Sequence, residues 1–239
     1  MFRMRLNAGF TLVELIIVIV ILGIVAVGTT QFISTSMQIY SDGNQRADLV
    51  AQARFILLRM EKEIRTAIPN SLTVSANCLR FYPIKNSGTY VGDISDNPLT
   101  VVNFNNNVVV GDAVVIYPTS VNSVVNARQI IAVDDQGSTD SVYGWQLTGE
   151  STLSSPGKRY YVPQSQVSFC SQTTAQGQAL VREQNGVQSL LGLGISQWLV
   201  QYSADTLERN AIVNIQLELQ SSTNERLALS HTVHIPNVP

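Results

Sequence analysis

Apolar residues are concentrated near one end of this chain. From Leu15 to Val27 nearly every position is Leu, Ile or Val, and no charged residue occurs between Glu14 and Asp42. With the residues just before it, this run gives about 18–20 mostly apolar positions, enough for a helix to cross a bilayer core about 30 Å thick. The pattern therefore predicts a membrane-spanning helix near the N-terminus.

A secretory signal peptide is the first alternative for this segment. Such a peptide has a basic start, an apolar core of about 7–15 residues and a small-residue cleavage site. Here the apolar run is longer, Glu14 interrupts its start, and no A-x-A-like site follows. Arg3 and Arg5 precede the run and the next basic residue is Arg46. We therefore expect a cytoplasmic N-terminus and an exported remainder.

The helical pattern continues beyond the apolar run but changes character. Six apolar residues recur at alternating steps of three and four: Val50, Ala53, Leu57, Met60, Ile64 and Ala67. That spacing predicts one apolar stripe on an amphipathic helix, and Glu61 and Arg65 are placed as a favourable i,i+4 pair. We expect one helix over residues 10–68, ended by Pro69. The turn-prone residues 41–44 leave open a break into two helices.

After residue 68 the period changes to that of strands. Short runs of β-branched and aromatic residues alternate with turn residues, and the clearest alternation lies near the C-terminus. The predicted strands are 79–84, 99–104, 113–117, 128–133, 142–147, 159–162, 167–170, 179–183, 198–202, 212–220 and 226–235. Exposed loops are expected at 85–98, 134–141 and 148–158. The fold class is therefore α+β, with an antiparallel β-rich head (69–239) packed on the amphipathic part of the helix.

Composition excludes several classes of protein. Charged residues make up 13% of the 239 residues, and a disordered chain needs far more charge and fewer apolar residues. The 15 basic and 17 acidic residues give a net charge of −2, which argues against a nucleic-acid binder. Two Cys and two His leave little for a zinc site. We expect no metal and no nucleic acid.

Candidate chemistry is sparse in the head. His231 and His234 lie three apart on a predicted strand, face opposite sides and cannot chelate one ion together; His231 is expected to be a satisfied core histidine. The sequence has neither a G-x-S-x-G elbow nor a nucleotide-binding motif. The acidic loop 134–140 is expected to be a solvated turn, with a calcium site as the alternative. We expect no enzyme activity and no cofactor.

Aromatic residues of the head include Trp145, Trp198 and the pair Tyr160 and Tyr161. We interpret them as core or subunit-contact residues rather than as a platform for a sugar.

Cys78 and Cys170 are the only cysteines. An even pair in an exported domain predicts a disulfide, which would close a loop of roughly 93 residues and contribute about 4–5 kcal/mol in the simple chain-entropy model. Two buried free thiols are the alternative.

The N-terminal motif carries a family resemblance. Gly9-Phe10-Thr11-Leu12-Val13-Glu14, after a short basic leader, resembles the processing site of type IV pilins and type II secretion pseudopilins. The resemblance implies that prepilin peptidase removes the leader 1–9 between Gly9 and Phe10 and methylates the new amine of Phe10. It also implies that Glu14 pairs with the N-terminal amine of a neighbouring subunit. A hydrated position at the membrane interface is the alternative for Glu14.

The stretches 53–60 and 67–71 resemble the larger pilins of the PilW and pseudopilin J type. This resemblance implies a minor pilin of a tip or initiation complex, in which residues 10–40 form the membrane and assembly helix and 41–68 its amphipathic continuation. Its partners would be major and minor pilins, prepilin peptidase and the inner-membrane assembly platform. The head would lie in the periplasm and later on the pilus. Alternatives are a tip adhesin binding a surface or glycan, a minor pseudopilin of type II secretion, and a membrane-anchored periplasmic enzyme.

Overall fold

The structure is a computed structural model that describes residues 10–103, 107–135, 142–149, 153–204 and 210–235. The chain forms two compact units, Met1–Asp48 and Leu49–Pro239, and we refer to the second as the head unit. The elements are α1 (Leu12–Ile64), β1 (Thr73–Ser75), β2 (Cys78–Phe81), β3 (Ile84–Val91), β4 (Leu99–Val102), β5 (Ala113–Ile116), α2 (Val121–Val125), β6 (Arg128–Asp135), β7 (Val142–Leu147), β8 (Arg159–Pro163), β9 (Val167–Thr174), β10 (Gly177–Gln184), β11 (Val187–Leu193), β12 (Ile195–Ser203), β13 (Ala211–Gln220) and β14 (Arg226–Ile235).

The first unit contains the start of α1. The helix begins at Leu12, two residues later than predicted, because Thr11 acts as its N-cap. The Thr11 hydroxyl accepts a hydrogen bond from the backbone N–H of Glu14 at 3.3 Å, and the Thr11 carbonyl accepts the first helical bond, from Leu15, at 3.2 Å. The sequence Thr11-x-x-Glu14 is that of a capping box. Residues 41–44 are helical, so the expected alternative of a break at this point is wrong.

The end of α1 differs from the prediction by four residues. The helix ends at Ile64 rather than at Ile68, and the chain then tightens into i→i+3 bonds from Thr66 to Glu63 and from Ala67 to Ile64. The N–H of Ile68 donates instead to the carbonyl of Tyr82. The backbone before Pro69 is therefore bonded to the connection between β2 and β3 instead of continuing the helix.

The amphipathic part of α1 forms the centre of the main core. Its buried residues are Leu49, Ala53, Ile56, Leu57, Met60 and Ile64, which confirms most of the predicted stripe and widens it by Leu49 and Ile56. They pack with apolar residues of β2, β9 and β10 and with those of β12, β13 and β14 in one cluster. Both sheets of the head unit thus share a single core with the helix.

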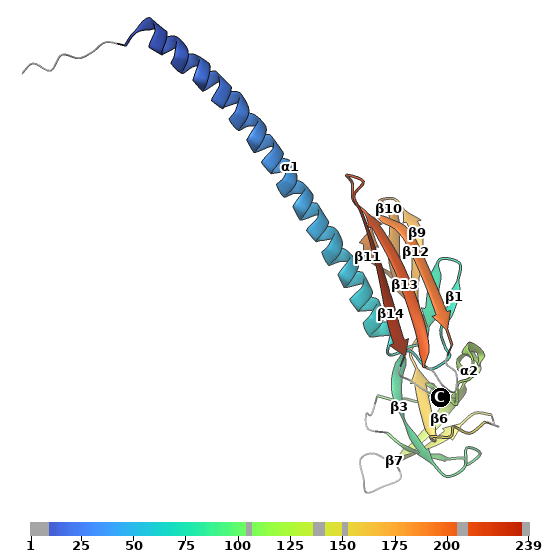
Figure 1. Cartoon of the computed structure of the whole chain (residues 1–239). Helices are drawn as coiled ribbons and strands as arrows, with labels where there is room; N and C mark the ends of the chain where they lie inside the picture. The colour runs from blue at the N-terminus through green and yellow to red at the C-terminus, as the bar shows by residue number, and fades with distance from the viewer. Residues whose placement is uncertain (1–9, 104–106, 136–141, 150–152, 205–209, 236–239) are drawn as a thin grey trace, which may run out of the picture. The chain divides into compact units, whose positions relative to one another are not determined.

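The two sheets are antiparallel, as predicted. One has the order β1-β2-β9-β10-β11 and the other β12-β13-β14. The β13–β14 ladder is regular over ten pairs, from Ala211 opposite Ile235 to Gln220 opposite Arg226. Figure 1 shows β9 to β14 gathered on one side of the head unit.

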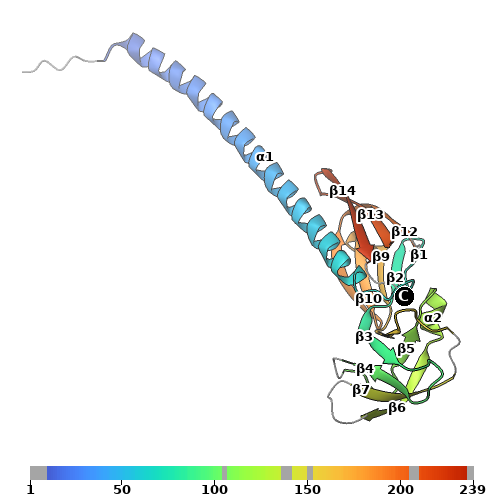
Figure 2. The same ribbon diagram turned by 60° about the horizontal axis from the view of Figure 1, so that its bottom comes forward.

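A barrel is inserted in the sequence between β2 and β9, two neighbouring strands of the five-stranded sheet. Strands β3 to β8 close into a six-stranded barrel of order β3-β4-β7-β6-β5-β8, although β2 before it and β9 after it pair directly. The barrel has its own apolar core, with Leu99, Trp145 and Tyr160 among its buried residues. Figure 2 shows β4, β5, β6 and β7 grouped apart from the sheets that pack on α1.

The head differs from the sequence prediction in several loops and strands. The predicted loop 85–98 contains most of β3, because its Lys, Asn, Ser and Gly residues fill a barrel strand whose Asn86 is buried and hydrogen-bonded. Strands β1 and β11 and the short helix α2 were not predicted. The predicted loop 134–141 starts inside β6, and residues 136–141 lie outside the described residues. Residues 148–149 and 153–158 carry no helix or strand.

Candidate assembly site

The N-terminal end of α1 carries the residues with a predicted role in assembly. Phe10 is 76% exposed and Leu12 74% exposed, and Glu14 is exposed in the first helical turn. A carboxylate at this position interacts favourably with the free N–H groups of a helix N-terminus. It also lies four residues from Phe10, the expected new N-terminus. Gly9 and the leader 1–9 lie outside the described residues.

The surface of α1 after Glu14 is almost entirely apolar. Within the described residues, one helix is long and apolar enough to cross a membrane, and none of that window is buried. Its large exposed apolar residues include eight consecutive positions: Leu15, Ile16, Ile17, Val18, Ile19, Val20, Ile21 and Leu22. A surface of this size needs lipid or other apolar surfaces to cover it.

Four of the hydroxyl groups on this segment are satisfied within the helix. Thr29 and Thr30 donate to carbonyls three and four residues earlier, at 2.9–3.2 Å. Thr35 donates to the carbonyl of Gln31 at 3.0 Å and Ser36 to that of Phe32 at 2.8 Å. Because these groups have partners in their own helix, they add little to the cost of placing the segment in an apolar environment.

Two carboxylates near the end of α1 fix the helix to both sheets. Glu61 Oε2 lies 2.8 Å from His231 Nε2 on β14, and its other oxygen lies 2.6 Å from Arg65. The hydrogen bond from His231, aided by Arg65 and opposed by burial, holds the pKa of Glu61 below its ordinary value. The ion pair between Glu61 and Arg65 confirms the predicted i,i+4 contact.

Glu63 makes the corresponding contact with the other sheet. Its two carboxylate oxygens share the single Nε–H of Arg182 on β10, at 2.8 and 3.0 Å, and one of them also accepts from Arg59 at 2.6 Å. The Glu63 and Arg182 side chains are only 14% and 17% exposed. The helix is therefore held to β14 by one carboxylate and to β10 by the other. The sequence places these glutamates on the polar side of the helix, and it gives no signal for their distant partners.

The outward helix face of the head unit carries an exposed apolar pair. Phe55 is 57% exposed and Leu58 is 62% exposed, and the exposed Arg54 and Lys62 lie beside them on α1. Large apolar side chains left uncovered between cations are a typical feature of a contact surface. We call these four residues the outward helix face.

The predicted cysteines, histidines and aromatic residues all lie in the head unit. Cys78 and Cys170 are opposite each other on β2 and β9 and form a disulfide with an S–S distance of 2.06 Å, so the predicted bond is present. His231 and His234 lie on β14; His231 shares the inner face but is 31% exposed, because it pairs with Glu61 at the sheet margin instead of entering the core. Trp145, Tyr160 and Tyr161 are buried in the head.

The acidic loop lies mostly outside the described part of the chain. Asp134 and Asp135 end β6, and residues 136–140 are not described. Within the described residues, no group of three or more His, Cys, Asp or Glu side chains is arranged to hold a metal ion.

Comparison with known proteins gives one match. The family model described as the prokaryotic N-terminal methylation motif matches residues 4–30. Neither the search of curated proteins nor that of solved structures found a match. The matched residues contain the Gly9–Glu14 motif and the start of the exposed apolar helix. The chain therefore carries a type IV pilin leader, which supports a pilin or pseudopilin that is processed by prepilin peptidase and anchored to the membrane.

Proposed function

We propose that this chain is a minor type IV pilin that acts in a tip or initiation complex of the pilus. Prepilin peptidase cuts between Gly9 and Phe10, the new amine of Phe10 is methylated, and the apolar helix leaves the inner membrane to enter the pilus. The observation that carries the proposal is the methylation motif over residues 4–30, followed by an apolar helix with no cover.

Glu14 is the residue on which assembly depends in this proposal. A carboxylate in an apolar surrounding is costly unless a cation neutralises it. Cleavage before Phe10 creates such a cation, the terminal amine, four residues away on every subunit. Pairing Glu14 with the amine of a neighbour compensates both desolvation costs at once and fixes the axial position of one subunit against the next.

The proposed organisation follows the roles of the segments. Residues 1–9 are the leader, 10–40 the membrane and assembly helix, 41–68 its amphipathic continuation and 69–239 the periplasmic head. Before assembly the chain crosses the inner membrane once, and afterwards its head is on the pilus. Its partners are other major and minor pilins and the inner-membrane assembly platform. We propose a structural rather than an enzymatic role.

The type of minor pilin is also a proposal. We propose a minor pilin like MshO of the mannose-sensitive haemagglutinin pilus, which the stretches 53–60 and 67–71, together with the C-terminal residues 233–239, resemble. Pilin-like subunits that form the terminal cap usually lack the glutamate, so a chain that keeps Glu14 is expected to lie below another subunit. The leader motif is shared with minor pseudopilins of type II secretion, which is the second candidate function.

The test compares two acidic residues of the same helix. With Glu14→Ala, pilus number should fall at least tenfold while the leader is still removed, since cleavage precedes assembly. Asp42→Ala is the matched control and should leave piliation intact. Mass spectrometry of the purified chain should show a methylated Phe10 as its first residue. A chain that still begins at Met1 in cells with active prepilin peptidase contradicts the proposal. Loss of secretion with normal pili would favour the pseudopilin.

A further inference from the structure

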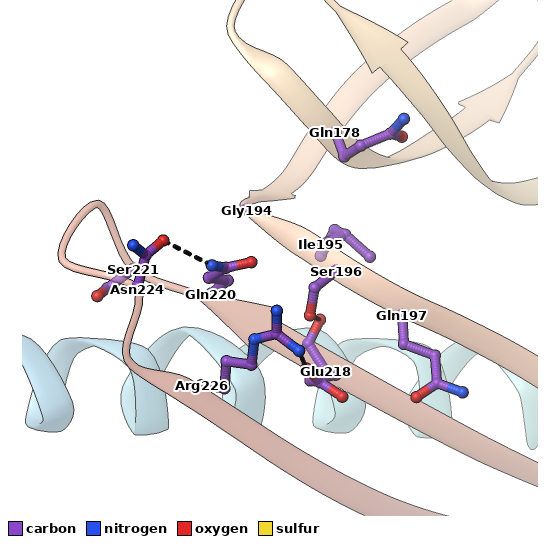
Figure 3. A pocket seen from close by; sticks show the side chains of 10 residues that line it. All are labelled: Gln178, Gly194, Ile195, Ser196, Gln197, Glu218, Gln220, Ser221, Asn224 and Arg226. Carbon is purple, nitrogen blue, oxygen red and sulfur yellow. Dashed lines mark hydrogen bonds and ion pairs between the residues drawn. The ribbon is translucent and has the colours of Figure 1, made fainter.

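A polar groove lies on the face of the β12–β13–β14 sheet that points away from α1, near the β13–β14 hairpin. Its volume is about 650 Å³, within the range of ligand sites in proteins. Figure 3 shows the side chains that line it, which come from β12, β13, β14, the β13–β14 hairpin and β10. The residues that carry the argument are Gln178, Gln197, Glu218, Gln220, Asn224 and Arg226.

The groove exists because small residues lie between long ones on this sheet. Ala228 is opposite Glu218 on β14, and Gln197 is opposite Glu218 on β12. A second hollow of about 210 Å³ opens over Ala228 and shares Gln197 and Glu218 with the first. The methyl group of Ala228 leaves the floor between these side chains open, so the two hollows adjoin at Gln197 and Glu218.

The β11–β12 turn closes one side of the groove. Gly194 has φ of +71°, and a Cβ at this position would collide with the backbone carbonyl of Gln220. Because Gly194 has no side chain, the turn packs directly on the backbone of β13. The position of Ser196 and Gln197 beside Gln220 follows from this contact.

The chemistry of the lining is neutral and rich in carboxamides. Four of the six side chains are amides, which both donate and accept hydrogen bonds. Gln220 donates to Asn224 at 2.8 Å and Gln178 donates to Thr173 at 2.8 Å, which leaves each of these amides further capacity. The side chain of Gln197 makes no hydrogen bond to another residue of the described chain.

The charges of the groove cancel. Arg226 lies 3.6 Å from Glu218, with the Arg226 side chain 65% exposed and that of Glu218 21% exposed. A site for a phosphate or carboxylate ligand needs an excess of cations, and the only cation in this lining already has a carboxylate beside it. The larger hollow offers little surface to an apolar ligand, because Ile195, the apolar side chain of its lining, is only 3% exposed.

We propose that this groove binds a neutral saccharide. Sugar hydroxyls both donate and accept, as the carboxamides do, and a row of them matches amides that project from neighbouring strands. An extended peptide fits less well, since peptides usually add to a sheet edge or insert side chains into apolar pockets, and this groove lies over a sheet face without such pockets. The groove belongs to the head unit and does not depend on N-terminal processing, so the proposal goes beyond the assembly role.

The test uses the purified full-length chain in a polyoxyethylene detergent, which carries no sugar, on an array of defined neutral, sialylated and sulfated glycans. We expect binding to neutral glycans that falls roughly tenfold or more in Gln197→Ala/Gln220→Ala. Gln201→Ala is the matched control, because this exposed glutamine lies on β12 outside the groove, and it should bind as the unaltered chain does.

A second variant blocks the groove without removing an amide. Ala228→Leu fills the floor beside Glu218 and should abolish the same binding, while the thermal unfolding midpoint stays within a few degrees. Three outcomes overturn the proposal: no glycan bound above background, binding limited to anionic glycans, or binding equal in all four proteins. Binding of pilin-derived peptides in place of glycans would likewise overturn it. None of these results bears on piliation, which the Glu14 experiment measures separately.

Discussion

Glu61 on α1 and His231 on β14 lie 2.8 Å apart, and this contact joins the part of α1 that lies in the head unit to the last strand that the structure describes. The hydrogen bond from His231 lowers the pKa of Glu61 below 4.5, the value expected in the unfolded chain. A depressed folded pKa means that the pair stabilises the head above that pH and that this contribution is lost as the pH falls through the folded pKa.

The resulting prediction concerns acid stability. Between pH 6 and pH 3 the midpoint of thermal unfolding should fall less in Glu61→Gln than in the unaltered chain, because the variant lacks the titrating carboxylate. Glu183→Gln is the control, since Glu183 accepts from a neutral partner, Gln188, and it should show the unaltered acid slope. Equal slopes for Glu61→Gln and the unaltered chain would contradict the prediction.

The two arginines that contact Glu63 should differ in their contribution to stability. Arg182 is 17% exposed and its Nε–H is shared by both oxygens of the carboxylate, whereas Arg59 is 47% exposed. We expect Arg182→Met to lower the free energy of unfolding by about 2–3 kcal/mol and Arg59→Met by less than about 0.5 kcal/mol. Urea denaturation measures both, and equal losses would show that the contact with β10 does not fix the helix.

The disulfide should stabilise the head through the length of chain that it encloses. Cys78 and Cys170 are 92 residues apart and directly opposite on β2 and β9, so their bond closes the loop that contains the whole barrel. Cys78→Ser/Cys170→Ser should lower the free energy of unfolding by about 4–5 kcal/mol in the chain-entropy model. Denaturant titrations without reductant give the value, and a loss below about 1 kcal/mol would refute this account.

Gly88 should be required for closing the barrel. Tyr160 lies opposite Gly88 on β8, and its hydroxyl donates to the carbonyl of Val102 at 3.2 Å. A Cβ at residue 88 would collide with that carbonyl and with the Tyr160 hydroxyl. We expect Gly88→Ala to cost about 1–3 kcal/mol and to alter the fluorescence of Trp145, whose ring lies 4.8 Å from that of Tyr160. Thr89→Ala, at an exposed position of the same strand, should change neither.

The outward helix face should matter for assembly and little for folding. Phe55→Glu/Leu58→Glu replaces two exposed apolar side chains, so thermal unfolding should stay near that of the unaltered chain while incorporation into pili falls at least tenfold. Val125→Glu, which changes a 63% exposed residue of α2, is the control and should be incorporated normally. Normal incorporation of the Phe55/Leu58 variant would show that neighbouring subunits do not use this face.

Much of the architecture follows from periodicity. The apolar run and the three-four spacing from Val50 to Ile64 predict α1 because helical burial depends on local spacing, and the alternation in β13 and β14 predicts a half-buried pair of strands. The Cys78–Cys170 bond could be predicted because only one pairing is possible. The helix and the two strands are predicted by residues close together in the sequence, and the disulfide by there being only two cysteines to pair.

The parts that could not be predicted depend on distant contacts. Residues 85–91 fall in the predicted loop 85–98, yet they belong to β3, in which Asn86 forms hydrogen bonds with Asn103 and Asn107. The partners of Glu61 and Glu63 lie 170 and 119 residues away, and no local pattern marks such pairs. The polar groove likewise arises from the register of three strands, which places Ala228 between longer side chains.

The way in which the barrel joins the sheet has a consequence for how the protein can be altered. The chain enters at Ile84 and leaves at Pro163, which are paired with each other, and Gln164 donates to the carbonyl of Pro83 at 2.7 Å. Entry and exit are thus adjacent, and the strands on either side are already covalently bridged. We therefore predict that residues 84–163 can be replaced by a short connector or another domain whose ends lie equally close, with the pairing of β2 and β9 retained.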